Sequence, residues 1–142
     1  MPRPLKFIFF LVLIIICASC NEIRVSTNKS VPPTFHISAG MAECCTKFTT
    51  VKVFEDYATN KQPVWEVNSN LEIDAEDSPR DITYGVTPAG FAQIVPKTGA
   101  APSLVEGREY LVIAGAPNYV PWARTCFVVK DVKIVEHECP KD

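Results

Sequence analysis

The chain has few of the residues that most enzymes use for chemistry. Its 142 residues include two histidines, His36 and His137, and neither has a credible nucleophile near it in sequence. The sequence contains no GxSxG, no HExxH and no glycine-rich phosphate loop, and no CxxC occurs after Cys20. We therefore predict no catalytic residue, no metal site and no cofactor, and we expect a protein that is not an enzyme.

Positive charge is also scarce. The chain has 14 Lys+Arg against 16 Asp+Glu, which gives a formal net charge of −2. Loss of residues 1–19, argued next, removes Arg3 and Lys6 and leaves a net charge of −4. A mildly acidic domain without a basic stripe does not favour nucleic acid as a partner.

Only one long apolar run occurs near the start of the chain, in residues 7–16. Arg3 and Lys6 precede this run, and Ala18 and Ser19 lead from it to Cys20. This order of positive, apolar and small residues is typical of a secretory signal. The run is shorter than a transmembrane helix, which needs about 20 residues. We expect residues 1–19 to be a cleaved signal.

The end of this segment resembles the bacterial lipobox, in which a small residue precedes an invariant lipidated cysteine. One position departs from that pattern, because Cys17 stands where it prefers Leu. The resemblance implies that Cys20 carries palmitate or a similar lipid and begins the mature protein. Asn21, rather than Asp, then implies the outer membrane in a cell that has one. We expect a cell-envelope protein, with a secreted or periplasmic protein and an uncleaved anchor as alternatives.

Residues 20–33 are predicted to be the lipidated cysteine and a polar tether that ends in Pro32 and Pro33. A flexible chain of about a dozen residues spans roughly 20 Å, which would lift a domain just clear of the headgroups. Residues 34–142 are predicted to be the folded domain. The mature chain is long enough for one domain with a real hydrophobic core.

The remaining sequence alternates short β-type segments with turn residues and has no convincing helical periodicity. The predicted strands are residues 34–38, 46–55, 64–68, 81–87, 91–95 and 109–114, followed by a long last strand over 125–135. Seven or eight strands at this spacing predict an all-β fold with two packed sheets, a sandwich.

Residues 104–114, LVEGREYLVIA, resemble the corner of fibronectin type III domains, where Leu, Gly and Tyr recur at this spacing before an alternating strand. Gly107 would permit the tight turn. Tyr110 would bury its ring while its hydroxyl caps a backbone group upstream. Trp65 is the predicted aromatic centre of the core, as in immunoglobulin-like folds. The chain also looks like uncharacterised bacterial lipoproteins with one such domain, which implies no defined activity.

Four cysteines remain beyond the lipidated one, namely Cys44, Cys45, Cys126 and Cys139. An even number in an exported chain predicts two disulfides. A bond between adjacent Cys44 and Cys45 is strained, so we place it last and leave the other two pairings open. Thirteen residues of extended strand separate Cys126 from Cys139 by roughly 43 Å, so the tail must turn back if both bridges form. A zinc site of Cys44, Cys45, His137 and Cys139 is an alternative.

Residues 116–122 join the last two predicted strands and contain the best candidates for binding, Tyr119 and Trp122. These residue types dominate interface hot spots. The alternative is that Trp122 folds back to cover the core. We expect a membrane-anchored module that binds another envelope protein or has a structural role. An inhibitor or immunity lipoprotein that blocks an exported enzyme or toxin is one alternative, and a small hydrolase or metal enzyme using His137 is another.

Overall fold

The computed structural model describes residues 23–39, 48–69, 79–115 and 122–140. These residues form nine β-strands and no helix. The strands are β1 (Ile23–Thr27), β2 (Thr34–Ala39), β3 (Thr50–Glu55), β4 (Trp65–Ser69), β5 (Asp81–Thr83), β6 (Phe91–Val95), β7 (Glu109–Gly115), β8 (Ala123–Lys130) and β9 (Lys133–His137).

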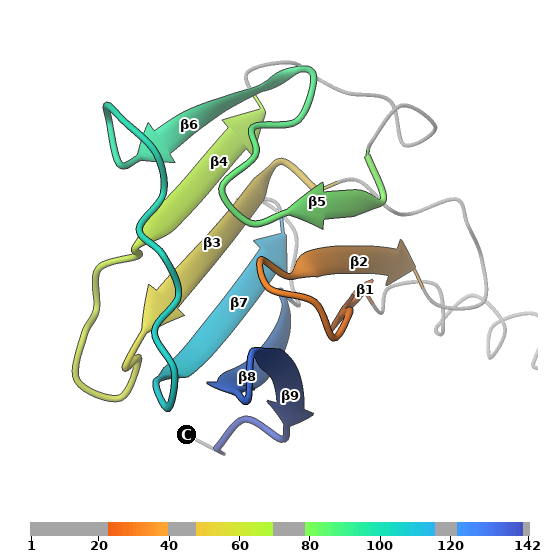
Figure 1. The fold of residues 1–142 in the computed structure, drawn as a ribbon. Coiled ribbons are helices and arrows are strands. Elements are labelled where there is room, and N and C mark those ends of the chain that lie inside the picture. Colours follow the sequence, from red (N-terminus) through yellow and green to blue (C-terminus); the bar gives the residue numbers. More distant parts are fainter. Residues whose placement is uncertain (1–22, 40–47, 70–78, 116–121, 141–142) are drawn as a thin grey trace, which may run out of the picture.

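The strands form two antiparallel sheets that pack face to face (Figure 1). The small sheet has the order β1-β2-β5, and the large sheet has the order β6-β4-β3-β7-β8-β9. Strand β1 of the small sheet lies against β7 and β8 of the large one. The predicted all-β, two-sheet sandwich is confirmed.

The core lies between the sheets and is built mainly from alternate residues of the strands other than β6. Its largest fully buried side chains include Trp65, Tyr110, Phe35, Phe48 and Phe127, each at most 1% exposed. The ring of Trp65 lies 5.4 Å from that of Tyr84 and 6.5 Å from that of Phe35, measured between centroids. The prediction that Trp65 is an aromatic centre of the core is confirmed. Burial of each such side chain contributes roughly 1.5–3 kcal/mol.

The predicted corner around Tyr110 is also present. The Val105 N–H donates to the Tyr110 hydroxyl at 2.8 Å, and that hydroxyl donates to Glu55 Oε1 at 3.3 Å. Gly107 has φ of +80°, which a residue with a side chain rarely adopts. The ring of Tyr110 stacks on Phe127 at 5.3 Å and 18°. Burial raises the pKa of the Tyr110 phenol, which keeps the hydroxyl protonated as a donor.

The structure corrects the predicted tether. Residues 23–27, which we expected to be flexible chain, form β1 and pair with β2 from Ile23↔Ala39 to Thr27↔Phe35. Val25 points into the core and is 8% exposed. The reason is tertiary, because a short apolar–polar alternation becomes a strand only when a partner strand and a core face are available.

The long last strand predicted over 125–135 is wrong. It is a hairpin, in which β8 and β9 are joined by Asp131 and Val132 with φ of +51° and +58°. Positive φ at both central residues is what a two-residue hairpin turn requires. A valine at such a position is unusual, so the sequence carries no turn signal there.

The end of β1 and the turn that follows it contact β9 through two hydrogen bonds. The Ile134 N–H donates to the Lys29 carbonyl at 3.2 Å, and the Thr27 N–H donates to the Glu136 carboxylate. Each contact satisfies a backbone group that would otherwise be open to another strand. One side of the sandwich is therefore bridged between the sheets.

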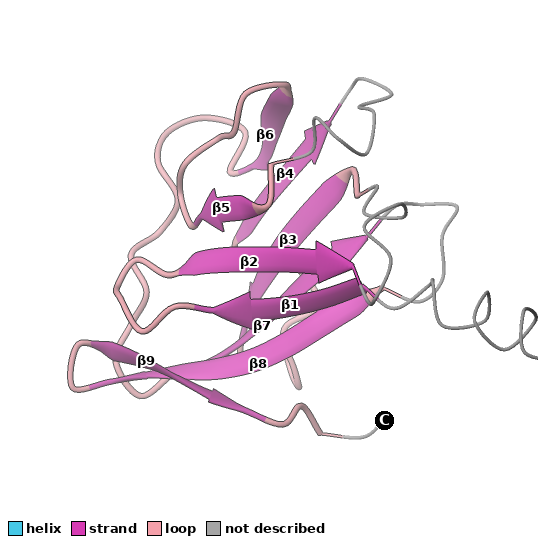
Figure 2. Cartoon of the chain, turned by 90° about the vertical axis from the view of Figure 1, so that its right-hand side faces the viewer, coloured by secondary structure: helices cyan, strands magenta, loops and turns pink. Residues whose placement is uncertain are grey.

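The strand ends define two ends of the sandwich, which are seen side-on in Figure 2. At one end β1 begins, β2, β4 and β7 end, and β3 and β8 begin (right in Figure 2). We call this the N-terminal end. The β1–β2 turn and the β8–β9 turn lie at the opposite end, which we call the far end.

Candidate functional site

Trp122, one of the two predicted binding residues, lies at the N-terminal end beside Gly115. Ala114 and Ala123 face each other in the core, so the next residues along, Gly115 and Trp122, face the outside of the large sheet. A Cβ placed on Gly115 would lie 2.6–2.9 Å from the Trp122 ring. Trp122 is therefore half-buried on the outer surface of the large sheet, and it does not cover the core. Tyr119 lies outside the described residues.

Among the described residues, Cys126 and Cys139 form a disulfide, with their Cα atoms 5.1 Å apart. This belongs to the pairing that the sequence argument placed last. Residues 125–135 are not one strand, because the β8–β9 hairpin returns the tail to β8 and sets His137 opposite Cys126. Cys20, Cys44 and Cys45 lie outside the described residues.

His137 lies on the same outer face, next to this disulfide. Its Nε2 lies 2.6 Å from Glu109 Oε2, and its Nδ1 lies 3.1 Å from the Glu138 carbonyl. Both ring nitrogens therefore face acceptors. Cys139 is bonded to Cys126, so it offers no thiolate for the zinc site considered above. The described residues contain no group of three or more side chains placed to hold a metal ion.

Two cavities flank the C-terminal arm that this disulfide fixes. One of about 540 Å³ is lined by Arg124, Thr125 and residues 136–139. The other, of about 310 Å³, is lined by residues 56–59, Glu109 and Pro140. Burial raises the pKa of Tyr57 there, and the negative charge of Glu109 adds to this while Arg124 opposes it. Both cavities are open to the surface.

His36, the other histidine, lies on the outer face of the small sheet. Its Nδ1 is 2.8 Å from Asp81 Oδ1, and the two side chains are 53% and 67% exposed. An ion pair this exposed contributes little to stability.

A third pocket lies at the far end, and we call it the far-end pocket. Its volume is about 260 Å³. Three segments that are distant in sequence line it: Val31 and Pro32, Tyr84 and Gly85, and residues 100–104. The described residues in this lining carry no carboxylate, imidazole, thiol or amine, and only Tyr84 and Ser103 offer hydroxyls. The pocket is suited to an apolar group.

Hydrogen bonds hold the walls of the far-end pocket in place. The Tyr84 N–H donates to the Pro33 carbonyl at 2.9 Å, and the Tyr84 hydroxyl donates to the Pro102 carbonyl at 2.7 Å. Tyr84 is 5% exposed, and this burial raises the pKa of its phenol. The corner bond from Val105 to Tyr110 fixes the chain just beyond Leu104. The pocket is therefore formed before anything enters it.

Sequence reasoning missed the far-end pocket. Residues 100–103 lie between two predicted strands, and nothing in residues 31–32 or 84–85 marks them as neighbours of that segment. The exposed valines near it, Val31, Val86 and Val105, are 36%, 56% and 48% exposed. A cluster of exposed apolar residues is the feature that could have indicated this pocket. The three valines are far apart in sequence, however, and only the fold brings them together.

Comparison of the chain with protein-family models, with curated proteins and with solved structures finds no match. Within the described ranges, no helix is long and apolar enough to cross a membrane.

Proposed function

We propose that this protein is a non-enzymatic binding module, held at the cell envelope by a lipid on Cys20. The observation that carries the binding role is the far-end pocket, which is preformed and apolar. Its volume of about 260 Å³ is below the roughly 300–1,000 Å³ of sites that enclose a small-molecule ligand. A pocket of this size and chemistry suits one or two apolar side chains of a protein partner.

The surroundings of the far-end pocket support protein binding over catalysis. Val31, Val86 and Val105 add exposed apolar surface beside a fixed cavity. An anchoring side chain that enters a preformed pocket pays little ordering entropy, which is how interface hot spots gain affinity. Catalysis would instead require titratable groups aimed into the cavity. The histidines lie elsewhere, on the outer faces of the two sheets.

Export is supported by the bond between Cys126 and Cys139. Disulfides persist in oxidising compartments and are rare in the cytosol. The bond therefore agrees with the signal and lipobox resemblance of residues 1–20.

An immunoglobulin-like or fibronectin-like ancestry is part of the proposal. The order β3-β7-β8 corresponds to strands C, F and G of such domains, with β1, β2 and β5 in the opposite sheet. Tyr110 lies near the start of β7, where the tyrosine corner of these domains occurs. Two features differ from antibody domains. Trp65 lies on β4, whereas the core tryptophan of those domains lies on strand C, and Val112 stands where the second core cysteine would be.

The test is a pull-down from detergent-solubilised envelopes with the full mature protein. Ala100→Arg adds a long charged side chain at the lining of the far-end pocket and should abolish capture of the partner. Thr98→Arg is the matched control, because it adds the same charge to the same loop outside the lining and should retain capture.

Two outcomes count against this proposal. If the wild-type protein captures no protein that the Ala100→Arg variant fails to capture, the pocket has no partner. If capture survives Ala100→Arg but is lost in Tyr119→Ala, Trp122→Ala, the N-terminal end is the binding surface. The anchor is tested separately, because mass spectrometry of the mature protein should find lipid on Cys20.

A further inference from the structure

We infer that the N-terminal end of the sandwich lies against the membrane that holds the lipid, with Trp122 in the headgroup region. The inference rests on the proposed lipid on Cys20. It adds the orientation of the domain, a role for Trp122, and the direction in which the far-end pocket faces.

The chain between the lipid anchor and the folded domain is short. Only Asn21 and Glu22 separate Cys20 from Ile23, the first residue of β1. Three Cα–Cα steps span at most about 11 Å. One headgroup layer is roughly 5–8 Å deep. Ile23 therefore stays close to the membrane surface.

Strand β1 is an integral part of the fold, so it does not lengthen the linker to the lipid. All five of its residues pair with β2. Val25 is 8% exposed in the core, and the Thr27 N–H is bonded to Glu136 of β9. Releasing β1 to lengthen the tether would expose this surface and break these bonds, so the domain cannot rise freely from the membrane.

Trp122 lies at the N-terminal end of the sandwich, as Ile23 does. The beginnings of β1 and β8 lie on the same side of the sandwich (right in Figure 2), and Trp122 immediately precedes β8. Its ring lies over Gly115, where no side chain intervenes. The ring is half-buried and its position is fixed by packing. Tryptophan is favoured at membrane–water interfaces because its ring is apolar while its N–H is polar.

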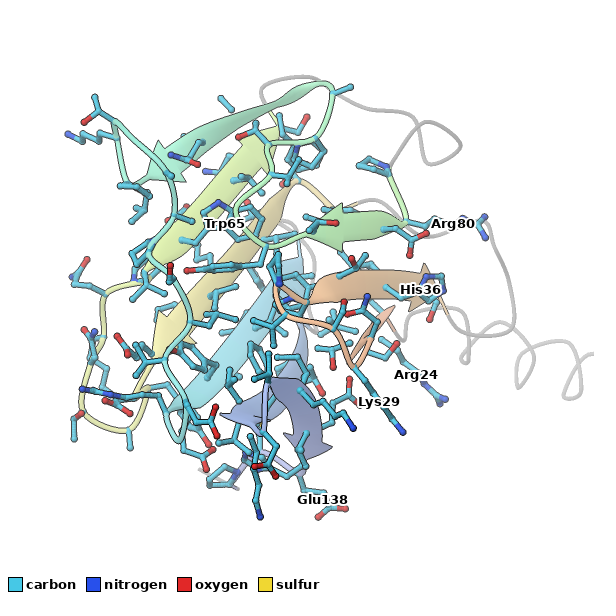
Figure 3. The ribbon with its side chains drawn as sticks, viewed as in Figure 1. Arg24, Lys29, His36, Trp65, Arg80 and Glu138 are labelled. Atoms are coloured by element: carbon cyan, nitrogen blue, oxygen red, sulfur yellow. A yellow bond between two sulfur atoms is a disulfide. The ribbon has the colours of Figure 1, made fainter. Side chains whose placement is uncertain are left out.

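Electrostatic attraction does not carry the inference. Arg24 and Arg80 are exposed beside the C-terminal end of β2 (Figure 3). However, the sequence between β4 and β5 adds Glu72, Asp74, Glu76 and Asp77. We therefore expect the contact to form on zwitterionic lipid and to be insensitive to salt. Under this orientation the far-end pocket points away from the membrane, where a partner can reach it.

The test uses the two tryptophans of the chain. The full lipidated protein is reconstituted into phosphatidylcholine vesicles, with or without a phospholipid that carries a nitroxide on its headgroup. In the Trp122→Phe variant only the fully buried Trp65 emits, so the difference from wild type isolates Trp122. We expect the nitroxide to quench most of the Trp122 emission and to leave Trp65 unchanged.

A matched reporter tests the opposite end. Val132→Trp in the Trp122→Phe background places an indole at the β8–β9 turn, where Val132 is 74% exposed. We expect no quenching there. With lipid on Cys20 verified by mass, an unquenched Trp122 or a quenched reporter at position 132 overturns the inference and leaves the anchor standing.

A native protein without lipid on Cys20 contradicts the anchor itself. In that case the same measurement is made on protein in which an established lipoprotein signal replaces residues 1–19 and forces acylation of Cys20. Quenching of Trp122 in that protein still supports the orientation, and its absence rejects it. The two failures are therefore distinguishable.

Discussion

The Tyr110→Phe variant tests the corner that ties the loop before β7 to the large sheet. The substitution removes one oxygen and keeps the ring. That oxygen accepts the Val105 N–H at 2.8 Å and donates to Glu55 at 3.3 Å. Tyr110 is 1% exposed, so water has little access to the space left by the hydroxyl.

The size of the effect follows from what stays and what is lost. The ring still stacks on Phe127, so no large cavity forms. A buried polar group that loses its partner costs about 1–3 kcal/mol. Val105 itself is 48% exposed, which lets its backbone recover part of that cost from water. We expect the variant to lose about 1–2 kcal/mol of unfolding free energy.

Equilibrium unfolding in urea, followed by the fluorescence of the buried Trp65, measures this loss. With a slope of about 1–3 kcal/mol per molar urea, the midpoint should fall by roughly 0.5–1 M at an unchanged slope. Tyr84→Phe is the comparison, because the Tyr84 hydroxyl makes one bond, to the Pro102 carbonyl at 2.7 Å. A midpoint for Tyr110→Phe equal to that of wild type would refute the corner as a source of stability.

Three further predictions concern the disulfide, the packing of Trp122 and the buried phenols. The double variant Cys126→Ser, Cys139→Ser opens a loop of 13 residues and should lower the unfolding free energy by about 3 kcal/mol; an equal urea midpoint with and without reductant in wild type would contradict this. Gly115→Ala puts a Cβ within 2.6–2.9 Å of the Trp122 ring, so it should destabilise by about 1–3 kcal/mol and shift the Trp122 emission, and an unchanged spectrum would count against the contact. Because burial raises the pKa of Tyr84, its contribution is complete below about pH 10, where the unfolded phenol is still protonated. Above that pH the unfolding free energy of the wild-type protein should fall by about 1.4 kcal/mol per pH unit, more steeply than that of Tyr84→Phe. If the urea midpoints of the two proteins fall equally as the pH rises, the prediction is wrong.

Local chemistry was enough to predict much of the fold. The predicted segments matched β2, β4, β6 and β7 to within a residue or two, and the alternation in β2 and β4 reflects the core face of those strands. The corner was also readable, since Gly107 and Tyr110 lie three residues apart and act on a turn between them. Trp65 was predictable as a core residue because a large ring gains most from burial.

The predictions from sequence were wrong where the pairing of strands determines the structure. Residues 23–27 read as tether, yet they form β1 because β2 supplies a ladder and β7 and β8 supply a face for Val25. Residues 125–135 read as one strand because Val132, a β-branched residue, occupies a turn position with φ of +58°. The pairing of Cys126 with Cys139 followed from that hairpin, so its misprediction was a consequence of the same error.

An all-β chain with an aromatic core and a glycine–tyrosine corner can be predicted from local sequence, since those features depend on neighbours within a few residues. The packing of the two sheets determines which distant segments come together. The far-end pocket needs residues 31–32, 84–85 and 100–104 to converge, and Trp122 needs Gly115 across a strand pair. Such contacts arise from how two twisted sheets pack, and no short stretch of the chain encodes that packing.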